Sequence, residues 1–195
     1  MKLVVGLGNP GAAYSRTRHT LGFRVVRLLS QKCHIPLKRS LRFKARLGQG
    51  RMEGKDVTLL LPATYMNRSG EGVSRWLAAE KLPLNEILVV LDDLQLPLGQ
   101  LRIREKGSEG GHQGLRSIIE AVGSGDFPRL RLGIGSPKET QAWEKYVLEP
   151  FRPLEEAVVK TMIEEAVDCC RLWVRQGTQA CATRFNVKAK KHGTV

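Results

Sequence analysis

Short apolar runs recur along the chain between polar and glycine-rich segments, in a pattern that predicts strands alternating with helices. The runs with the length of buried strands cover residues 3–5, 57–61, 87–91, 100–104 and 129–134. Elsewhere, apolar residues recur every three or four positions, which is the period of an amphipathic helix. These helical segments cover residues 19–31, 69–82, 113–122 and 153–176.

The alternation of strands and helices predicts an α/β fold with helices on both faces of a central sheet. The longest helical segment begins with Pro153 and ends before Gly177, and these residue types favour those two positions. The strand pairs near residues 45–61 and 87–104 are too close in sequence for a connecting helix. Part of the sheet should therefore be antiparallel, and we expect a mixed sheet in a single domain.

The first strand runs into the loop GLGNPG at residues 6–11, whose glycines fit the G-x-G-x-x-G pattern of dinucleotide-binding proteins. Pro10 lies inside this loop and has no N–H group to offer a pyrophosphate. An acid that binds the ribose should follow about 20 residues later, yet the first acidic residue of the chain is Glu53. We therefore predict no nucleotide cofactor and interpret the loop as a strand end that presents polar groups such as Asn9.

Basic residues are in large excess, with 32 Lys and Arg against 19 Asp and Glu, a formal net charge of +13. The excess is concentrated between residues 32 and 55, where eight basic residues accompany the single acid Glu53. This balance favours a polyanionic partner, although a basic protein without such a partner would have the same composition. We expect one domain over residues 1–195, with a basic and flexible tail from about residue 187.

Other features of the composition argue against several classes of protein. No apolar run approaches the roughly 18 residues of a membrane span, and a strand follows Met1 almost at once, which argues against a signal peptide. The four cysteines lack C-x-x-C spacing, so reduced thiols in the cytoplasm are the simplest interpretation. Cys33 beside His34 is too small a set of ligands to predict a metal site.

Polar residues gather where the predicted strands end and the predicted helices begin. They are Asn9, His19, Asn67, Asp92 and His112. Each alone has an ordinary explanation as a turn, cap or surface residue. Together they are the components of a hydrolytic site, in which a histidine takes a proton from water, a carboxylate orients that histidine and amides stabilise an oxyanion. The chain has no G-x-S-x-G or H-E-x-x-H motif of a serine or zinc hydrolase.

Several segments resemble the bacterial-type peptidyl-tRNA hydrolase family and follow its order from residue 5 to residue 151. They are VGLGNPGAAYSRTRH, LPATYMNRSGEGV, VVLDDLQLPLGQLRIREKGSEGGHQGL, FPRLRLGIGSP and YVLEPF. The resemblance implies a monomeric, cytoplasmic α/β enzyme that needs no cofactor. Its partner would be peptidyl-tRNA, and it would recycle tRNA by cleaving the ester between a peptide and the tRNA 3′ end.

The resemblance also implies roles for individual positions. His19 matches the catalytic base and Asp92 its orienting partner, while Asn9 and Asn67 match residues that hold the substrate and polarise the ester carbonyl. The other matched positions are a site tyrosine at Tyr14, a packing wall at Met66, substrate-binding residues at His112 and Gln113, and a pair at Arg104 and Arg131 that grips the tRNA 5′-phosphate. Basic groups at such positions suit a phosphate chain.

Three positions depart from the family pattern. Thr20 and Gln113 stand where the family usually has asparagine, and Gln95 stands where an acid is common. Because the histidine, the aspartate and both asparagines are intact, hydrolysis is the favoured hypothesis. The departures leave a second hypothesis open, namely a noncatalytic RNA-binding member of the same fold. The two hypotheses differ in whether His19 does chemistry.

Overall fold

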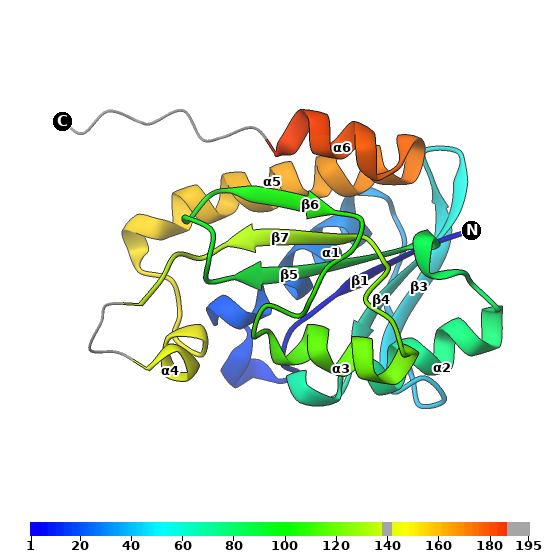
Figure 1. Cartoon of the computed structure of the whole chain (residues 1–195), viewed down its shortest axis with the longest axis horizontal. Helices are drawn as coiled ribbons and strands as arrows, with labels where there is room; N and C mark the ends of the chain where they lie inside the picture. Colours follow the sequence, from blue (N-terminus) through cyan, green and yellow to red (C-terminus); the bar gives the residue numbers. More distant parts are fainter. Residues whose placement is uncertain (138–141, 187–195) are drawn as a thin grey trace.

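The apolar runs lie side by side in one sheet, in a computed structural model that describes residues 1–137 and 142–186. Within those residues the sheet has seven strands in the order β2-β3-β4-β1-β5-β7-β6 (Figure 1). The strands are β1 (Lys2–Gly6), β2 (Lys38–Ser40), β3 (Ala45–Met52), β4 (Lys55–Pro62), β5 (Ile87–Asp93), β6 (Leu101–Arg104) and β7 (Arg129–Gly133).

The sheet is mixed, as the sequence predicts. β1 is parallel to β4 and β5, and β5 is parallel to β7. β3 is antiparallel to β2 and β4, and β6 is antiparallel to β7. One expectation is wrong: β5 and β6 are not a strand pair, because β7 lies between them. The short connection over residues 94–100 therefore crosses the width of a strand, and β7 fills that gap later in the chain.

The predicted helices are all present, together with two short ones. The α-helices of the described residues are α1 (Leu21–Lys32), α2 (Gly70–Glu80), α3 (Gln113–Val122), α4 (Trp143–Val147), α5 (Pro153–Gln176) and α6 (Thr178–Phe185). The sequence pattern missed β2, α4 and α6, which are too short to show a clear period. The basic tail predicted from about residue 187 lies outside the described residues.

Helices cover both faces of the sheet and bury an apolar layer on each, which confirms the predicted architecture. α1 and α5 pack on one face, against strand residues that include Val4. α2 and α3 pack on the other face, against residues that include Leu3 and Val5 (Figure 1). This division follows from the alternation of side chains along a strand. Among residues 1–137 and 142–186, no helix combines the length and the apolar character needed to cross a bilayer.

The start of α1 lies in direct contact with the end of β1, and glycines allow this approach. A Cβ atom on Gly22 would lie 2.3 Å from the Val90 carbonyl oxygen and 2.4 Å from the Leu7 nitrogen. A Cβ atom on Gly6 would lie 2.3 Å from the Gly22 carbonyl oxygen. These neighbours are backbone atoms, which cannot turn aside as a side chain can. The contact therefore fixes the position of the turn that contains His19, just before α1.

We predict that Gly22→Ala destabilises the protein, although alanine favours helices by about 1 kcal/mol over glycine. The added methyl group overpacks the contact, so the free energy of unfolding should fall by about 1–3 kcal/mol. Denaturant unfolding measures this change. Gln31→Ala, at an exposed position of the same helix, is the control and should have little effect. Equal stability of the Gly22→Ala and parent proteins would show that the contact is looser than described.

Candidate active site

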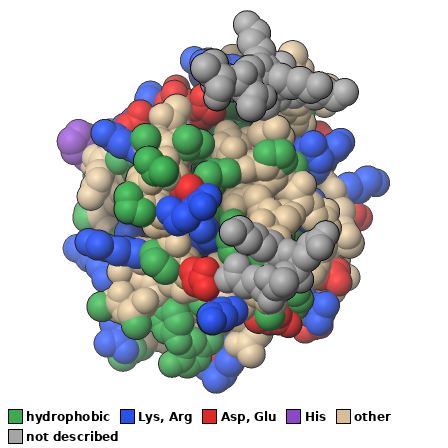
Figure 2. Space-filling model, turned by 90° about the vertical axis from the view of Figure 1, so that its left-hand side faces the viewer, with side chains coloured by type: hydrophobic (Ala, Val, Ile, Leu, Met, Phe, Trp, Pro, Cys, Tyr) green, Lys and Arg blue, Asp and Glu red, His purple; other side chains and the backbone are tan. Residues whose placement is uncertain are grey.

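Three neighbouring parallel strands bring the predicted polar residues together at the end of the sheet where these strands finish. β1, β4 and β5 are neighbours that run in the same direction, so their carboxyl ends meet. Asn9 follows β1, Met66 and Asn67 follow β4, and Asp92 lies near the end of β5. Figure 2 looks onto this end of the molecule.

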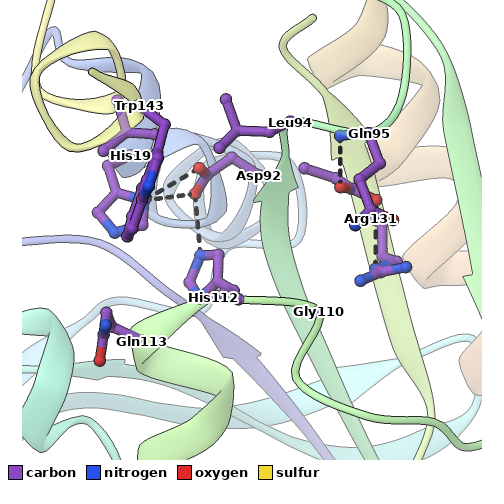
Figure 3. Close-up of a pocket in the computed structure, with 12 residues that line it drawn as sticks. His19, Asp92, Leu94, Gln95, Gly110, His112, Gln113, Arg131 and Trp143 are labelled. Atoms are coloured by element: carbon purple, nitrogen blue, oxygen red, sulfur yellow. Dashed lines mark hydrogen bonds and ion pairs between the residues drawn. The ribbon is translucent and has the colours of Figure 1, made fainter. Parts of the chain in front are cut away.

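His19 is hydrogen-bonded to Asp92 through its Nδ1 atom (Figure 3). Nδ1 lies 2.9 Å from Oδ2 and 3.0 Å from Oδ1 of the carboxylate. The histidine occupies a 3₁₀ turn, Arg18–Thr20, and so precedes α1 rather than beginning the helix as the pattern predicted. Because an ionised carboxylate only accepts, Nδ1 carries the proton, and Nε2 of the neutral ring keeps a free lone pair.

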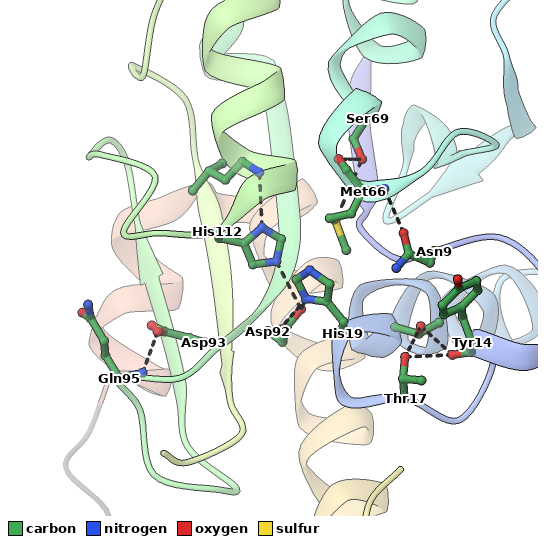
Figure 4. Close-up of polar contacts among 12 residues, drawn as sticks. Asn9, Tyr14, Thr17, His19, Met66, Ser69, Asp92, Asp93, Gln95 and His112 are labelled. Carbon is green, nitrogen blue, oxygen red and sulfur yellow. Dashed lines mark hydrogen bonds and ion pairs between the residues drawn. The ribbon is translucent and has the colours of Figure 1, made fainter. Parts of the chain in front are cut away.

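His112 uses the same carboxylate, a contact that the sequence did not predict. Its Nε2 atom lies 3.2 Å from Asp92 Oδ1, and its Nδ1 atom accepts a hydrogen bond of 3.3 Å from the Leu115 N–H (Figure 4). Since Nδ1 is an acceptor, Nε2 must be the atom that donates to Asp92. The ring centroids of His19 and His112 are 4.7 Å apart. Asp92 therefore holds two imidazole rings at once.

The shared carboxylate gives the two histidines opposite pKa shifts. Burial lowers the pKa of His19, but the charge of Asp92 and the hydrogen bond to it outweigh burial and raise that pKa above 6.5. For His112 burial dominates, and the pKa is lowered. Burial also opposes ionisation of Asp92, yet the two histidines hold the pKa of its carboxyl well below the usual range. His19 is therefore the histidine that takes up a proton first as the pH falls, while His112 remains a neutral donor to lower pH.

Asn9 is fixed by the chain after β4 in a way that leaves its amide group available. Its Oδ1 atom accepts a hydrogen bond of 2.8 Å from the Met66 N–H. The carbonyl oxygen of Met66 accepts a second bond of 2.8 Å from the Ser69 hydroxyl. Because the oxygen of Asn9 is occupied, its Nδ2 group is oriented toward the side of His19 (Figure 4). This group can donate to an oxygen of a substrate.

A pocket of about 230 Å³ opens beside the His19–Asp92 pair (Figure 3). It is lined by His19, Asp92, Asp93, Leu94, Gln95, Gly110, Gly111, His112, Gln113, Arg131, Trp143 and Val147. These residues come from the end of β5, the glycine loop before α3, β7 and α4. Leu94, Trp143 and Val147 give the pocket apolar walls, which suit an acyl or peptide group.

Five of the predicted residues do not line this pocket, namely Asn9, Tyr14, Met66, Asn67 and Arg104. Asn67 is exposed and lines a depression between α2 and α3. Tyr14 is half-buried, and its ring meets that of Tyr65 edge-on with centroids 6.5 Å apart. Tyr65 is 62% exposed, so the two rings form an aromatic surface near Asn9 that the sequence did not predict.

Comparisons with known proteins identify relatives that match most of the chain. The family model described as peptidyl-tRNA hydrolase matches residues 3–193. A peptidyl-tRNA hydrolase of Aquifex aeolicus is 49% identical over 173 residues, 87% of this chain and 88% of that protein. One from a Synechococcus species is also 49% identical, over 95% of this chain and 83% of that protein. The crystal structure of the peptidyl-tRNA hydrolase from Acinetobacter baumannii has a TM-score of 0.91 at 37% identity, covering 96% of this chain and 95% of that one.

The chain belongs to the peptidyl-tRNA hydrolase family. This confirms the family and the fold that the sequence motifs indicated. The roles that the resemblance implies for single residues remain predictions.

The two arginines that match the family's 5′-phosphate pair lie at the β6–β7 edge of the sheet. Arg104 is exposed, whereas Arg131 is half-buried and its Nε atom lies 3.3 Å from Oδ2 of Asp93. In strand register Arg131 is opposite Arg102, and Arg104 is opposite the buried Arg129. Since alternate residues share a face, the exposed Arg102 lies on the same face as the predicted pair. The family resemblance did not identify it.

Arg129 holds the glycine loop that precedes α3. Its guanidinium group donates to the carbonyl oxygens of Gly107 and Gly125, at 2.5 Å and 2.6 Å. Burial lowers the pKa of Arg129 to about 10, so it stays charged at neutral pH. The loop that it holds leads directly to His112, which gives this arginine a structural role in the active site.

The three departures from the family pattern fall in different environments. Thr20 is fully buried, and its hydroxyl donates to the Tyr14 carbonyl oxygen at 2.8 Å and lies 2.9 Å from the Thr17 hydroxyl. It stabilises the turn before α1 and lines no part of the pocket. Gln113 lines the pocket at the first position of α3, and Gln95 lines it as an exposed residue.

The three side chains His19, Asp92 and His112 also have the composition of a metal site. Among the described residues, their ligand atoms lie within 4.8 Å of one another. Their nitrogen–oxygen contacts, at 2.9 Å and 3.2 Å, have hydrogen-bond lengths. Each contact uses the nitrogen and oxygen atoms that a metal would need. The geometry fits a base with its orienting carboxylate.

We predict that the two histidines titrate on opposite sides of 6.5. In an NMR titration of the histidine side chains, His19 should protonate above this pH and His112 below it. Asp92→Asn removes the negative charge beside His19, so the pKa of His19 should fall. Asp93→Asn, which removes a carboxylate with no bond to His19, is the matched control. A His19 pKa below 6.5 in the parent would show that Asp92 does not stabilise the protonated ring.

Proposed function

We propose that this protein hydrolyses the ester that joins a peptide, or an N-blocked aminoacyl group, to the 3′ end of tRNA. The observation that carries the proposal is the hydrogen bond of 2.9 Å between His19 Nδ1 and Asp92. It fixes the ring so that Nε2 is free to act as a base beside a pocket with apolar walls. Membership of the peptidyl-tRNA hydrolase family supports the same reaction.

The reaction needs one water molecule between His19 and the ester carbonyl. Nε2 of His19 takes a proton from this water, and the water oxygen forms a bond to the carbonyl carbon. The carbonyl oxygen becomes an oxyanion, which the Asn9 amide stabilises as a hydrogen-bond donor. When the tetrahedral intermediate collapses, the bond to the ribose oxygen breaks and His19 returns its proton to that oxygen. The products are free tRNA and a peptide with a carboxyl end.

Asp92 supports both proton transfers. It holds the imidazole of His19 in one tautomer, and its charge stabilises the imidazolium that exists between the two transfers. His112 donates to the same carboxylate while it remains neutral, because its own pKa is lowered by burial. It therefore positions Asp92 without competing for the proton that His19 takes from water.

The remaining residues serve the two ends of the substrate in this proposal. The acyl group enters the pocket, with His112 and Gln113 beside it and Met66 as a wall next to Asn9. Asn67 and Tyr14 lie on the exposed side of the site and bind the terminal nucleotide. The T-shaped contact between Tyr14 and the exposed Tyr65 supports this assignment, since aromatic rings stack on bases.

Arginines at the β6–β7 edge of the sheet bind the RNA part of the substrate. Arg104 and Arg131 grip the tRNA 5′-phosphate, with Arg102 on the same face of β6. The formal net charge of +13 supports an extended contact with a phosphate backbone. The proposal includes action as a monomer, and a tRNA substrate favours the cytoplasm.

A noncatalytic RNA-binding role is not favoured. RNA binding alone gives no reason for a buried carboxylate that contacts two histidines whose pKa values are shifted in opposite directions. The relatives of this chain are also named for hydrolysis. The departures at Gln95 and Gln113 change the rim of the pocket and leave His19 and Asp92 in place.

We expect His19→Ala to lower the single-turnover rate of ester cleavage by roughly 10² to 10⁴-fold, the usual contribution of a general base. Affinity for tRNA should change little, because this buried residue is not a phosphate contact. The measurement follows release of free tRNA from an N-blocked aminoacyl-tRNA. Asp92→Asn should lower the rate as well, by favouring the wrong tautomer of His19.

The matched control is His34→Asn. His34 is exposed beyond the end of α1, with a positive φ of 53° that asparagine tolerates. This variant should keep the parental rate. Parental turnover by His19→Ala would contradict the mechanism, and a parent that binds tRNA without cleaving it would favour the noncatalytic alternative.

A further inference from the structure

Three arginines gather at the β2–β3 edge of the sheet, the edge opposite Arg104. Arg39 of β2 is directly opposite Arg46 of β3 in the strand register, so their side chains share a face. Arg27 of α1 lies close enough to Arg46 that its pKa is lowered, first by burial and then by the charge of Arg46. All three residues are exposed. We call this group, Arg27 with Arg39 and Arg46, the edge cluster.

No carboxylate neutralises the edge cluster within the part of the chain that the structure describes. The single acid between residues 32 and 55 is Glu53, and it pairs with Arg171 at 2.6 Å. At the far end of β3, Arg51 lies 3.8 Å from Asp56. Positive charge is therefore balanced at one end of β3 and unbalanced at the end nearer the active site.

Contacts with uncharged groups hold two members of the cluster in place. Arg46 donates from Nη2 to the Leu37 carbonyl oxygen at 3.2 Å. The guanidinium of Arg27 lies 5.4 Å from the centre of the Phe23 ring. Neither contact removes charge, and like charges directly opposite each other destabilise a sheet. The cluster is a preorganised positive surface whose repulsion a bound anion would relieve.

The edge cluster lies within reach of an RNA bound at the catalytic histidine. Arg46 is in register with Leu61, one residue before the end of β4, and the chain then turns to Met66. β3 is two strands from β1, about 10 Å at roughly 4.8 Å per strand (Figure 1). Arg27 is six residues into α1, about 9 Å along its axis. Figure 2 shows Lys and Arg side chains spread over this end of the molecule.

We propose that the edge cluster is a second phosphate-binding surface for RNA, separate from Arg104 and Arg131. The ligand is the sugar–phosphate backbone of a structured RNA, because arginine forks match phosphate groups and need no particular base. The RNA is the body of the substrate tRNA, because the edge cluster lies at the active-site end of the sheet. This inference rests on the proposed function, and binding of a separate RNA is an alternative outcome of the test.

The test uses a double variant that carries both Arg39→Gln and Arg46→Gln and so lacks two positive charges. This variant is compared with the parent protein. Arg51→Gln on the same strand is the matched control, because it removes a charge at the balanced end of β3. Each protein is assayed with an N-blocked aminoacyl-tRNA and with the same ester on the terminal CCA trinucleotide, between about 50 and 200 mM salt. Binding of uncharged tRNA and of an unrelated RNA hairpin is measured by fluorescence anisotropy, and the melting temperature is recorded.

We expect the double variant to raise KM for the tRNA substrate severalfold at unchanged kcat, with the trinucleotide ester unaffected. The slope of log affinity against log salt should flatten by roughly two, about one for each phosphate that the variant no longer neutralises. The melting temperature should stay the same or rise, because a like-charge repulsion is removed. Weaker binding of the hairpin, with the tRNA constants unchanged, would identify a separate RNA as the ligand.

Parental binding of both tRNA and the hairpin by the double variant would overturn the proposal. An equal loss on the trinucleotide ester would also overturn it, because the arginines would then act through the active site or the fold. A lower melting temperature with unchanged RNA binding would show that their role is structural. The binding measurements need no turnover. An inactive parent would therefore contradict the proposed function, while the binding data would still test the edge cluster as an RNA-binding surface.

Discussion

The proposed chemistry of this protein depends on one buried carboxylate that two imidazole rings share. Asp92 is 2% exposed, and burial alone would disfavour its charge. Hydrogen bonds from His19 and His112 keep it ionised, and the charge in turn sets which histidine accepts a proton. Without these hydrogen bonds, a buried charge would have no partner, which is costly. The turn before α1 and the glycine loop before α3 must therefore converge on the end of β5.

In the proposed function, the order of strands separates the chemistry from the binding of RNA. Asp92 lies on β5 near the middle of the sheet, next to β1 and its asparagine loop, where helices on both faces exclude water. Uncompensated or exposed arginines occur at the two edges, with Arg104 on β6 and Arg39 on β2. Buried groups thus tune proton transfer by desolvation, while exposed charges supply affinity that salt can screen.

Local features of the sequence predicted the fold class and several helices and strands. The spacing of apolar residues, and the residue types that begin or end a helix, can be recognised within a short segment. The bounds of α3 and α5 follow the apolar spacing and Pro153 closely. The pairing of His19 with Asp92 was implied by the family resemblance, because the two residues are distant in sequence and no local pattern links them. The insertion of β7 between β5 and β6 could not be predicted from local features, since strand order depends on contacts distant in sequence.

Two side chains show where local sequence was insufficient. His112 accepts from the Leu115 N–H as a helix cap would, and nothing in its neighbourhood in the sequence indicates that it also binds a carboxylate 20 residues away. Its place in a glycine loop before a helix was the one available signal. Thr20 adjoins His19 in sequence, yet its side chain is buried and supports the turn.

The pH dependence of the single-turnover rate tests the central claim most directly. If neutral His19, held by Asp92, is the base, the rate should fall on acidification with an apparent pKa above 6.5, because the raised pKa of His19 removes the base at a higher pH than an ordinary histidine would. The same pH should mark the titration of His19 itself. A rate that persists as the pH falls through 6.5, or an acid limb with an apparent pKa below that value, would contradict the account.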